Sequence, residues 1–402
     1  MDDARRVRAL REDEVAVWLR LRNAAFGSSA DLADPEVARS VAWRVPFIRV
    51  AEADGAIAAA ATWYPYPAWI GGAHLPTGAL ASVASAPAAR RRGHVRALVA
   101  AGLRELHETG VGWSGEHPFD PRFYDAFGYR RVPSSVVLEL PVERLPGRAR
   151  DVAFGPVEPT DPALRKIRRA FASRRSFTLD RDAPAGLGTG TDELPLRWRD
   201  LFDAPDDKAS PATAYRCEGG YALVATEGFG ADGILHVVDA AWTDAAARAR
   251  VLALLTAWDG QVGRVRLELP VDDPLARRDG DERARPRTPL QVRIVDVATA
   301  LAPLRSPAGA GGTLVLELHD SLAPWNDGRW RIETGPAGCH VAPTRELPDA
   351  TLDVGSLAAL LAGTPPAALL MTGEAEGDSQ ALRTLHALTI DHPPFLGLAD
   401  YF

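Results

Sequence analysis

The sequence predicts a mixed α/β fold divided into three domains, and three observations lead to it. The chain has 402 residues, more than the roughly 150 typical of one domain. Short apolar runs of strand type alternate with longer segments in which apolar residues recur at helical spacing. Stretches rich in proline, glycine and charge, residues 141–162 and 279–289, interrupt this alternation. We therefore expect domains at residues 1–145, 146–288 and 289–402.

The first domain is expected to begin with a helix followed by a β-hairpin. After a strand-like start, residues 7–26 carry apolar side chains at helical spacing. Two apolar runs, residues 47–53 and 56–63, are separated by Asp54 and Gly55, a pair typical of hairpin turns. This order predicts a helix and then two antiparallel strands.

A long helix is expected after the hairpin. Residues 76–86 form a strand candidate, and residues 88–109 keep their apolar side chains on one helical face until Gly110 ends the helix. Shorter elements complete the domain: a strand at residues 111–114, a helix at 121–127 and a strand at 136–140.

The second and third domains also mix both types of element. The second repeats the strand, strand, helix, strand order of the first. Its expected elements are a helix at residues 165–172, strands at 221–225 and 234–240, a helix at 245–258 and a strand at 264–269. Those of the third domain are strands at residues 312–319 and 329–333 and helices near 356–361 and 379–388.

The charge of the chain argues against a nucleic-acid partner. Its 46 basic residues are outnumbered by 53 acidic ones, which gives a net charge of -7. Such a chain lacks the general attraction for phosphates on which nucleic-acid binders depend, whereas a small cationic molecule suits it.

Neither membrane insertion nor secretion is expected. Uncharged stretches at residues 56–89 and 357–371 are broken by prolines and glycines, so neither predicts a continuous spanning helix. The charged N-terminus lacks the apolar segment of a secretory signal. Cys217 and Cys339 fit neither a disulfide framework nor a metal-ligand spacing. We therefore expect a cytoplasmic protein without a metal and without a membrane partner.

The most informative segment is residues 76–98, PTGALASVASAPAARRRGHVRAL. It joins an apolar strand to a helix through three arginines, residues 90–92, followed by Gly93 and His94. A turn of this kind with a glycine inside it lets backbone N–H groups point at one spot, and the helix dipole adds partial positive charge there. Such a turn suits a pyrophosphate, although a solvated basic turn before a helix has the same pattern.

The order of strands and helices around this turn, over the first 140 residues, resembles the GCN5-related N-acetyltransferase (GNAT) fold. The GNAT fingerprint, Q/R-x-x-G-x-G/A, lies between the fourth strand and the next helix and binds the pyrophosphate of acetyl-CoA. Arg90 and Gly93 match it, and Val95 replaces its second small residue.

The runs PTGALASVASAPAARRRG and RFYDAFGY, the terminal DYF and the three-part layout are similar to the actinobacterial Eis (enhanced intracellular survival) family. In that family an N-terminal GNAT domain precedes a second GNAT-like domain and a domain resembling sterol carrier proteins. The resemblance implies this fold, an acetyl-CoA co-substrate and a homohexamer.

The resemblance also implies an acetyl-CoA site in the first domain. Val83 and Ser85, on the strand before the turn, would offer backbone groups to the pantetheine arm and to the thioester oxygen. Four residues of the turn would surround the pyrophosphate: Arg90, Arg91, Gly93 and His94.

Two catalytic groups follow from the same resemblance. Tyr124 matches the tyrosine that Eis enzymes use as general acid, because the departing CoA thiolate must acquire a proton. The carboxylate of Phe402, the last residue, would be the general base, and it is ionised at neutral pH. A buried packing role for Tyr124 and a frayed C-terminus are the alternatives. Glu116 and His117 are further candidates for the base, or residues of an ordinary loop.

The predicted function is direct acetyl transfer from acetyl-CoA to primary amines of aminoglycosides or similar polyamines, an antibiotic-resistance activity. Direct attack is expected because no cysteine lies in the predicted site region. A protein lysine or a metabolite amine is the alternative acceptor. The non-enzymatic alternative is a lipid-binding or scaffold protein that uses the domain resembling sterol carriers.

Overall fold

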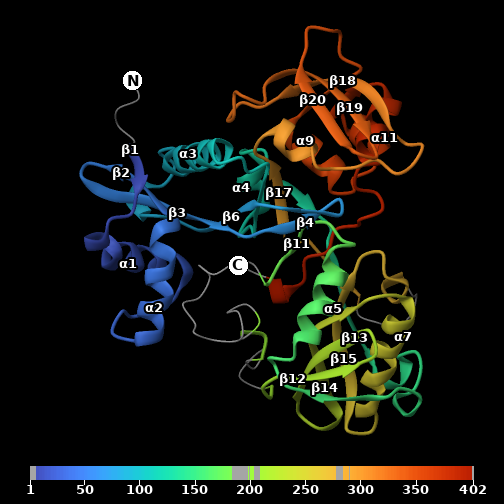
Figure 1. Cartoon of the computed structure of the whole chain (residues 1–402). Helices are drawn as coiled ribbons and strands as arrows, with labels where there is room; N and C mark the ends of the chain where they lie inside the picture. The colour runs from blue at the N-terminus through green and yellow to red at the C-terminus, as the bar shows by residue number, and fades with distance from the viewer. Residues whose placement is uncertain are drawn as a thin grey trace.

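The mixed fold and its division into sheet-containing bodies are seen in a computed structural model. The structure describes residues 6–182, 198, 200–202, 209–277, 284–288 and 290–400. Figure 1 shows three bodies, coloured blue to cyan, green to yellow and orange, and each combines strands with helices. The predicted mixed fold is therefore confirmed. No helix in these ranges is long and apolar enough to cross a bilayer.

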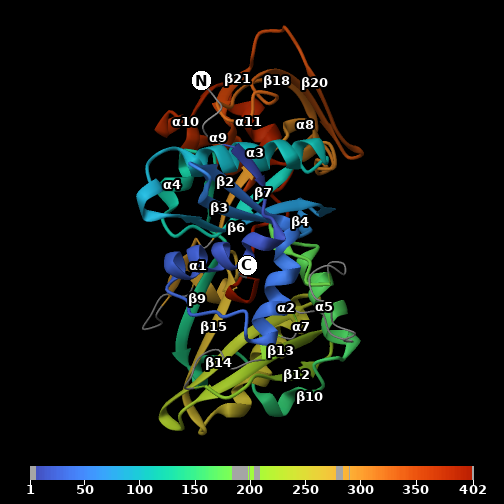
Figure 2. The ribbon, with the colours of Figure 1, turned by 90° about the vertical axis from the view of Figure 1, so that its left-hand side faces the viewer.

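A seven-stranded sheet forms the first domain, in the order β1-β2-β3-β6-β7-β17-β8. Its strands are β1 (Arg6–Ala9), β2 (Ile48–Ala53), β3 (Ala56–Pro65), β6 (Thr77–Ser85), β7 (Trp113–Glu116), β8 (Arg130–Val132) and β17 (Leu290–Ile294). Its helices are α1 (Val15–Phe26), α2 (Pro35–Arg44), α3 (His94–Glu108) and α4 (Pro121–Asp125). Helix α3 lies on one face of the sheet, and α1 and α2 lie on the other (Figures 1 and 2).

Strand β3 shows why both faces of this sheet are covered. Ala59 and Trp63 belong to the apolar cluster under α3, whereas Ala60 belongs to the cluster under α1 and α2. This alternation follows from the two-residue period of a strand. Helix α2 was not predicted, although its start carries two ordinary signals: the Asp34 side chain accepts from the backbone N–H of Glu36, and a proline stands at the first helical position.

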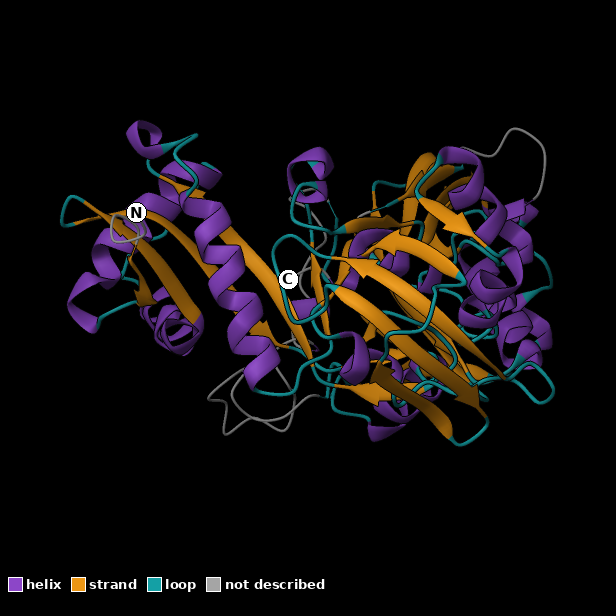
Figure 3. Cartoon of the chain, turned by 90° about the horizontal axis from the view of Figure 1, so that it is seen from above, coloured by secondary structure: helices purple, strands orange, loops and turns teal. Residues whose placement is uncertain are grey.

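The second domain has its own seven-stranded sheet, in the order β10-β12-β13-β14-β15-β9-β16. Its strands are β10 (Phe154–Val157), β12 (Thr213–Cys217), β13 (Gly220–Glu227), β14 (Gly230–Trp242), β15 (Val262–Pro270), β9 (Ser135–Pro141) and β16 (Arg285–Arg287). Helices α5 (Pro162–Ala172) and α7 (Ala245–Leu254) pack against it. Figure 3, seen from above, shows the first domain with the N-terminus to one side of the second and third domains, which overlap in this view.

The first two sheets exchange strands. Strand β9 follows the first domain in sequence but pairs with β15 in the second sheet, with Leu138 opposite Leu267. Strand β17 follows the second domain but lies between β7 and β8 in the first sheet. The exchange links the two domains through backbone hydrogen bonds. Domain boundaries placed near residues 145 and 288 along the sequence do not show this exchange.

In its described residues the third domain contains a five-stranded sheet and four α-helices. The strands are β18 (Gly312–His319), β19 (Gly328–Gly335), β20 (Gly338–Pro343), β21 (Ala350–Asp353) and β22 (Ala375–Gly377). The helices are α8 (Val297–Leu301), α9 (Val354–Leu361), α10 (Pro366–Thr372) and α11 (Ser379–His386). Every residue of α9 is buried, and this helix packs against β17 and β8 of the first sheet.

A small three-stranded sheet joins the first and second domains. It consists of the hairpin β4 (Ala68–Ile70) and β5 (Ala73–Leu75) with β11 (Thr178–Leu179), a segment that follows α5. The C-terminal tail, coloured red, descends from the third domain and ends as the short 3-10 helix η9 (Leu398–Asp400). In both views η9 lies between the first domain's helices and the second domain (Figures 1 and 2).

Candidate active site

Strand β6 extends beyond its parallel pairing with β7, which covers the whole of β7 but only the first half of β6. They pair in parallel from Thr77 opposite Trp113 to Leu80 opposite Glu116, and the described pairing goes no further. The edge of β6 beyond Leu80 therefore presents backbone donors and acceptors to a ligand.

A bulge lies in this half of β6, which pairs with β3 on one edge but not with β7 on the other. The register between β3 and β6 shifts opposite Ala61, and Ser82 has a φ of 50°, which is unusual for a residue other than glycine. Val83 and Ser85, the two residues predicted to contact pantetheine, lie in this half of the strand and are partly buried.

The predicted anion-binding turn is present at the start of α3. Gly93 is the N-cap residue with a φ of 81°, and no side chain caps the amides of the first turn. Arg91 also has a positive φ, 60°. A helix start without a capping side chain, in a glycine-containing turn, is able to bind an anion.

The side chains of this turn fit the same role. Arg90, Arg91 and Arg92 are exposed, and none forms an ion pair within the described part of the chain. His94 is buried at the first position of α3. The three guanidinium groups are therefore free to pair with phosphates.

Tyr124 lies on α4, a short helix that begins with a proline after the N-cap Asp120. Its ring is 3 % exposed and packs edge-to-face against Phe123, Tyr129 and Phe119, with centroid distances of 5.0, 6.2 and 5.9 Å. Phe119 is itself 74 % exposed. This cluster packs the ring of Tyr124 against Tyr129, whose hydroxyl hydrogen-bonds to Ser114 on β7.

Glu116, the last residue of β7, is a buried carboxyl group in this region. It is 1 % exposed, and neither carboxyl oxygen has a hydrogen-bond partner. Burial, with a smaller contribution from Asp125, raises the pKa of Glu116 to about 9. The group therefore holds its proton at neutral pH and is not a base there.

The neighbours of Glu116 come from β17 and α4. Gln291 stands directly opposite Glu116 on the paired strand, and its side-chain N–H group donates to Asp125 at 2.9 Å. The side-chain oxygen of Gln291 is buried without a partner. A protonated Glu116 suits this environment, because an ionised carboxylate would face Asp125 without a cation.

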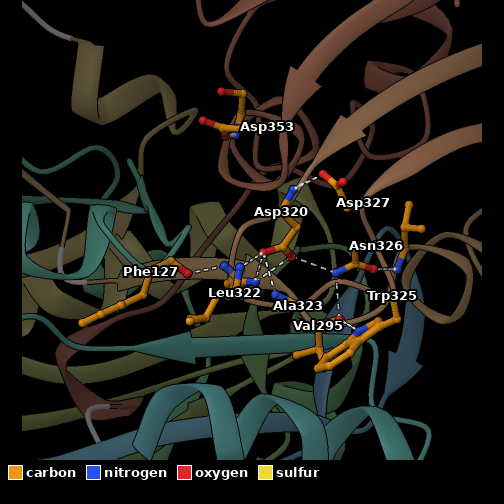
Figure 4. A network of polar contacts seen from close by, with 12 residues as sticks. Phe127, Val295, Asp320, Leu322, Ala323, Trp325, Asn326, Asp327 and Asp353 are labelled. Atoms are coloured by element: carbon orange, nitrogen blue, oxygen red, sulfur yellow. Dashed lines mark hydrogen bonds and ion pairs between the residues drawn. The ribbon is translucent and has the colours of Figure 1, made fainter. Parts of the chain in front are cut away.

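The third domain holds α4 through a buried arginine of β17. One terminal nitrogen of Arg293 donates to both carboxylate oxygens of Asp320, at 2.8 and 2.7 Å, and the other contacts the Phe127 carbonyl. Figure 4 shows Asp320 between Phe127 and Asn326, whose amide also donates to it at 3.0 Å. A Cβ atom at Gly128 would overlap Arg293, so a glycine is required after α4.

The opposite face of the first sheet carries an aromatic and cationic cluster. Trp43 stacks on Tyr64 with ring centroids 5.2 Å apart. Arg22 and Arg44 both interact electrostatically with Tyr64, and neither has an acidic partner among the described residues. Burial and then Arg44 lower the pKa of Arg22, whose Nε atom is buried without a hydrogen bond.

Phe402, the predicted general base, lies outside the described residues. Asp400, two residues earlier, is fully buried and receives hydrogen bonds from Arg168 and Arg181. His117, the other candidate, follows β7 and is partly buried. The structure thus brings Glu116 at the end of β7 close to Asp125 of α4, and it places the basic turn between β6 and the start of α3.

Several residues near this site were not found from the sequence. Arg293 and Asp320 are 27 positions apart, and Arg22 and Arg44 belong to different helices, one of them unpredicted. Local patterns indicate buried faces but not which charged residues meet across domains, so no signal in the sequence identified these four residues.

Comparisons with known proteins agree with this architecture. Two family models described as acetyltransferase (GNAT) domain match residues 6–132 and 194–294, and one described as sterol carrier protein domain matches residues 297–397. The predicted sequence of two GNAT domains and a domain resembling sterol carriers is confirmed.

Similar curated proteins and solved structures span nearly the same length. An uncharacterized N-acetyltransferase of Streptomyces avermitilis is 26% identical, with 89% of each chain covered. The N-acetyltransferase Eis of Mycobacterium tuberculosis is 28% identical, with 78% of each covered. The structure of a GCN5-related N-acetyltransferase from Anabaena variabilis gives a TM-score of 0.84 at 22% identity, covering 99% of this chain and 100% of that one. Eis1 from Mycobacterium abscessus gives 0.79 at 21%, with the same coverage.

Proposed function

Since the chain is a GNAT-family acetyltransferase and a relative of the Eis proteins, we propose that it transfers acetyl from acetyl-CoA to primary amines of aminoglycosides or similar polyamines. The observation that carries this proposal is the free edge of β6 beyond β7, which leads to an α3 start without a capping side chain. Beside it are three arginines that form no ion pair with any described residue. That arrangement offers a strand edge to an extended amide-bearing arm and a cationic turn to its pyrophosphate.

The residues present fit acetyl-CoA. Arg90 and Arg91 would pair with the pyrophosphate, and the close approach of its oxygens would need the absent side chain of Gly93. His94 would lie beneath the same group. Val83 and Ser85 would hydrogen-bond the pantetheine arm through their backbone, with one N–H group at the thioester oxygen. Acetyl-CoA supplies the activated acetyl group.

The proposed mechanism needs one base and one acid. The attacking amine must lose a proton, and the terminal carboxylate of Phe402 accepts it, directly or through a water. Tyr124 donates its hydroxyl proton to the departing thiolate. Glu116 does not take the place of the base, because its raised pKa keeps it neutral at pH 7. A neutral Glu116 leaves the terminal carboxylate of Phe402 and His117 as candidates for the base.

A second acceptor class has a specific observation in its favour. Arg22 and Arg44 lie beside Tyr64 on the face covered by α1 and α2, and neither is neutralised by an acid in the described chain. A polycation would be repelled there, whereas an amine that also carries a carboxylate or phosphate would be attracted. A metabolite amine with an acidic group is therefore the second candidate.

The test is an acceptor panel incubated with acetyl-CoA and N-terminally tagged protein. It contains aminoglycosides, linear polyamines and amines that carry an acidic group. Thiol release measures turnover, and mass spectrometry counts the acetyl groups on each product. Acetylated aminoglycosides or polyamines support the proposal. Turnover confined to acidic amines would replace it with the second candidate, and thiol release with none of them would overturn both.

Three further expectations stay predictions. The homohexamer and a contribution to antibiotic resistance follow from the Eis resemblance, and the cytoplasmic location follows from the cysteines and the charged N-terminus. Measurement of molar mass by light scattering tests the first of them.

A further inference from the structure

The loop between β18 and β19, residues 320–327 of the third domain, takes part in the packing of the first domain. Leu322 and Trp325 of this loop pack against the apolar cluster under α3. The same cluster contains Tyr124 of α4 and Leu103 of α3. Figure 4 shows the loop with its polar contacts. The third domain therefore supplies side chains to the core of the acetyltransferase domain, and we call residues 320–327 the wedge loop.

On one side the wedge loop holds α3, the helix that begins at the basic turn. The indole of Trp325 stacks on the ring of His107, in the last turn of α3, with centroids 4.5 Å apart and 12° between the planes. Nδ1 of His107 lies 2.9 Å from the carboxylate of Asp296, the N-cap residue of α8. The Trp325 N–H group donates to the Val295 carbonyl at 2.8 Å. The C-terminal end of α3 is thereby fixed to the third domain.

On the other side the wedge loop holds α4 through Arg293. The side chains of Arg293 and Asp320, which form an ion pair, are each 1 % exposed. Asp320 is itself fixed by the loop, because one carboxylate oxygen accepts from the backbone N–H groups of Leu322 and Ala323, at 3.1 and 3.0 Å. Arg293 in turn contacts the Phe127 carbonyl just after α4. A displacement of the loop would therefore move Arg293 and the end of α4 with it.

A second arginine holds the same end of α4. Arg130 on β8 donates to the carbonyls of Asp125 and Tyr129, at 3.2 and 3.0 Å. Its other terminal nitrogen donates to the side chain of Asp353, the N-cap residue of α9, at 3.1 Å. A Cβ atom at Gly355 would lie 2.7 Å from the Arg130 guanidinium, so the first turn of α9 approaches this arginine closely. Two acidic residues of the third domain thus orient two arginines around the end of α4.

Stability alone does not account for the buried pair. A buried ion pair adds little stability compared with apolar side chains of similar volume, although removal of one partner is costly. What the pair adds is direction, because a guanidinium held by a carboxylate presents its remaining N–H groups at defined positions. The Asp125 and Phe127 carbonyls that accept from the two arginines lie one and three residues after Tyr124. The contacts therefore favour placement of Tyr124.

We propose that the third domain positions the acid of the acetyl-transfer reaction: the wedge loop fixes α4 relative to α3 through Arg293, and so sets the Tyr124 hydroxyl against acetyl-CoA bound at the start of α3. This inference rests on the proposed function of Tyr124 as general acid. Arg293, Asp320 and Arg130 are positioning residues, because they act on Tyr124 through the backbone and not on the reacting atoms. The domain resembling sterol carriers then serves catalysis in the first domain, a role that needs no lipid ligand.

The first variant removes both charges of the buried pair at once. Arg293→Met with Asp320→Asn leaves no unpaired buried charge, so the melting temperature should stay close to the native value. Asparagine also keeps one oxygen for the backbone N–H groups of the loop. The contact with the Phe127 carbonyl is lost, and a misplacement of roughly 1 Å can cost roughly 100-fold in rate. We expect kcat at saturating substrates to fall at least about tenfold while acetyl-CoA affinity is retained, since Trp325 still holds α3.

Hydrogen exchange gives a readout that does not depend on activity. The backbone N–H groups of Phe127 and Gly128 donate to the Tyr124 and Asp125 carbonyls, at 2.9 and 3.1 Å. In the double variant, without acetyl-CoA, peptides that cover residues 119–129 should exchange faster than in the native protein. Peptides from α7 of the second domain should not change. Unchanged exchange in residues 119–129 would overturn the proposal.

A matched pair in the second domain is the control. Arg248 donates to Asp273 at 2.6 Å, and Asp273 accepts from the backbone N–H group two residues later, as Asp320 does. Arg248→Met with Asp273→Asn should keep native kcat and native exchange in residues 119–129. An equal loss of kcat in this control would assign the effect to general destabilisation and overturn the proposal.

Arg130→Met decides the question if the double variant fails to fold. It leaves only Asp353 unpaired, a side chain that is 48 % exposed, and it removes two carbonyl contacts around the end of α4. We expect a lower kcat and faster exchange in residues 119–129. Native values of either quantity would overturn the proposal.

A second background separates this inference from the proposed function. In Tyr124→Phe the acid is already absent, so Arg293→Met with Asp320→Asn should add little to the loss in kcat. Losses that multiply would overturn the positioning role alone. If Tyr124→Phe itself keeps native kcat, the proposed acid fails and this inference fails with it, a result that requires no change in the third domain.

Discussion

The buried carboxyl of Glu116 predicts how the free energy of unfolding depends on pH, which can be measured directly. Its two oxygens have no hydrogen-bond partner and its pKa is about 9, against an ordinary value of 4.5. Glu116→Gln replaces a protonated carboxyl with a neutral group of the same shape. The substitution removes the titration and leaves the packing at the end of β7 nearly unchanged.

The expected magnitude follows from the difference between the two pKa values. Between pH 4.5 and 9 the unfolded chain releases this proton and the folded chain keeps it. The free energy of unfolding is therefore highest below pH 4.5, as far as Glu116 is concerned. It falls as the pH rises toward 9, by at most about 1.4 kcal/mol per pH unit. From pH 5 to pH 7 the loss is about 3 kcal/mol, an upper bound because water entering the site would reduce it.

The assay is thermal unfolding of native protein and Glu116→Gln from pH 5 to pH 8, without acetyl-CoA. The variant should gain stability relative to the native protein as the pH rises. Glu376→Gln, at an exposed position on β22, is the control and should follow the native protein throughout. A constant difference between Glu116→Gln and native protein across this range would refute the assignment of a buried, protonated carboxyl.

Three further predictions concern the turn, the acid and the link to the third domain. Gly93→Glu should abolish detectable acetyl-CoA binding in calorimetry without unfolding the protein, because a carboxylate would face the pyrophosphate; unchanged affinity would contradict the placement of the cofactor. Tyr124→Phe should lower kcat by roughly 100-fold with little change in acetyl-CoA affinity, and a variant with most of its kcat would leave Tyr124 a packing role. Asp320→Ala should lower the free energy of unfolding by about 3 to 5 kcal/mol because it leaves Arg293 charged and unpaired; a melting temperature equal to that of the native protein would show that the pair adds no stability.

The local parts of the site could be predicted from the sequence, and the structure has them where expected. The strand, the basic turn and the helix that follows are encoded by neighbouring residues, with apolar periodicity on both sides of Gly93. The short helix that carries Tyr124 is likewise marked at its start, by Asp120 and a proline. Each of these signals depends on a few neighbouring residues, so it can be recognised in the sequence.

The long-range parts could not be predicted, for physical reasons. Strand β17 pairs with β7 and β8 in the first sheet although it follows the second domain in sequence, and its composition does not specify which sheet it joins. Burial of Glu116 depends on that pairing, so its raised pKa is not visible in the sequence. Asp400 meets Arg168 across 232 positions, and no local pattern specifies such a partner. Helix α2 is different, because the sequence contains its capping signals but the helix was not predicted from them.

The central claim is that two distant parts of the chain form one catalytic site, with Tyr124 from the first domain and the terminal carboxylate delivered by the tail. A tag at either end of the protein tests it most directly, because a C-terminal tag converts the carboxylate of Phe402 into a neutral amide. A general base contributes roughly 10² to 10⁴ in rate.

The measurement is kcat at saturating amine for the two tagged proteins, from pH 6 to pH 9, together with the acetyl-CoA dissociation constant of each. We predict equal affinity for acetyl-CoA and a loss of at least 100-fold in kcat for the C-terminally tagged protein alone. Equal turnover of the two proteins across this range would remove the C-terminus from the mechanism and contradict the account.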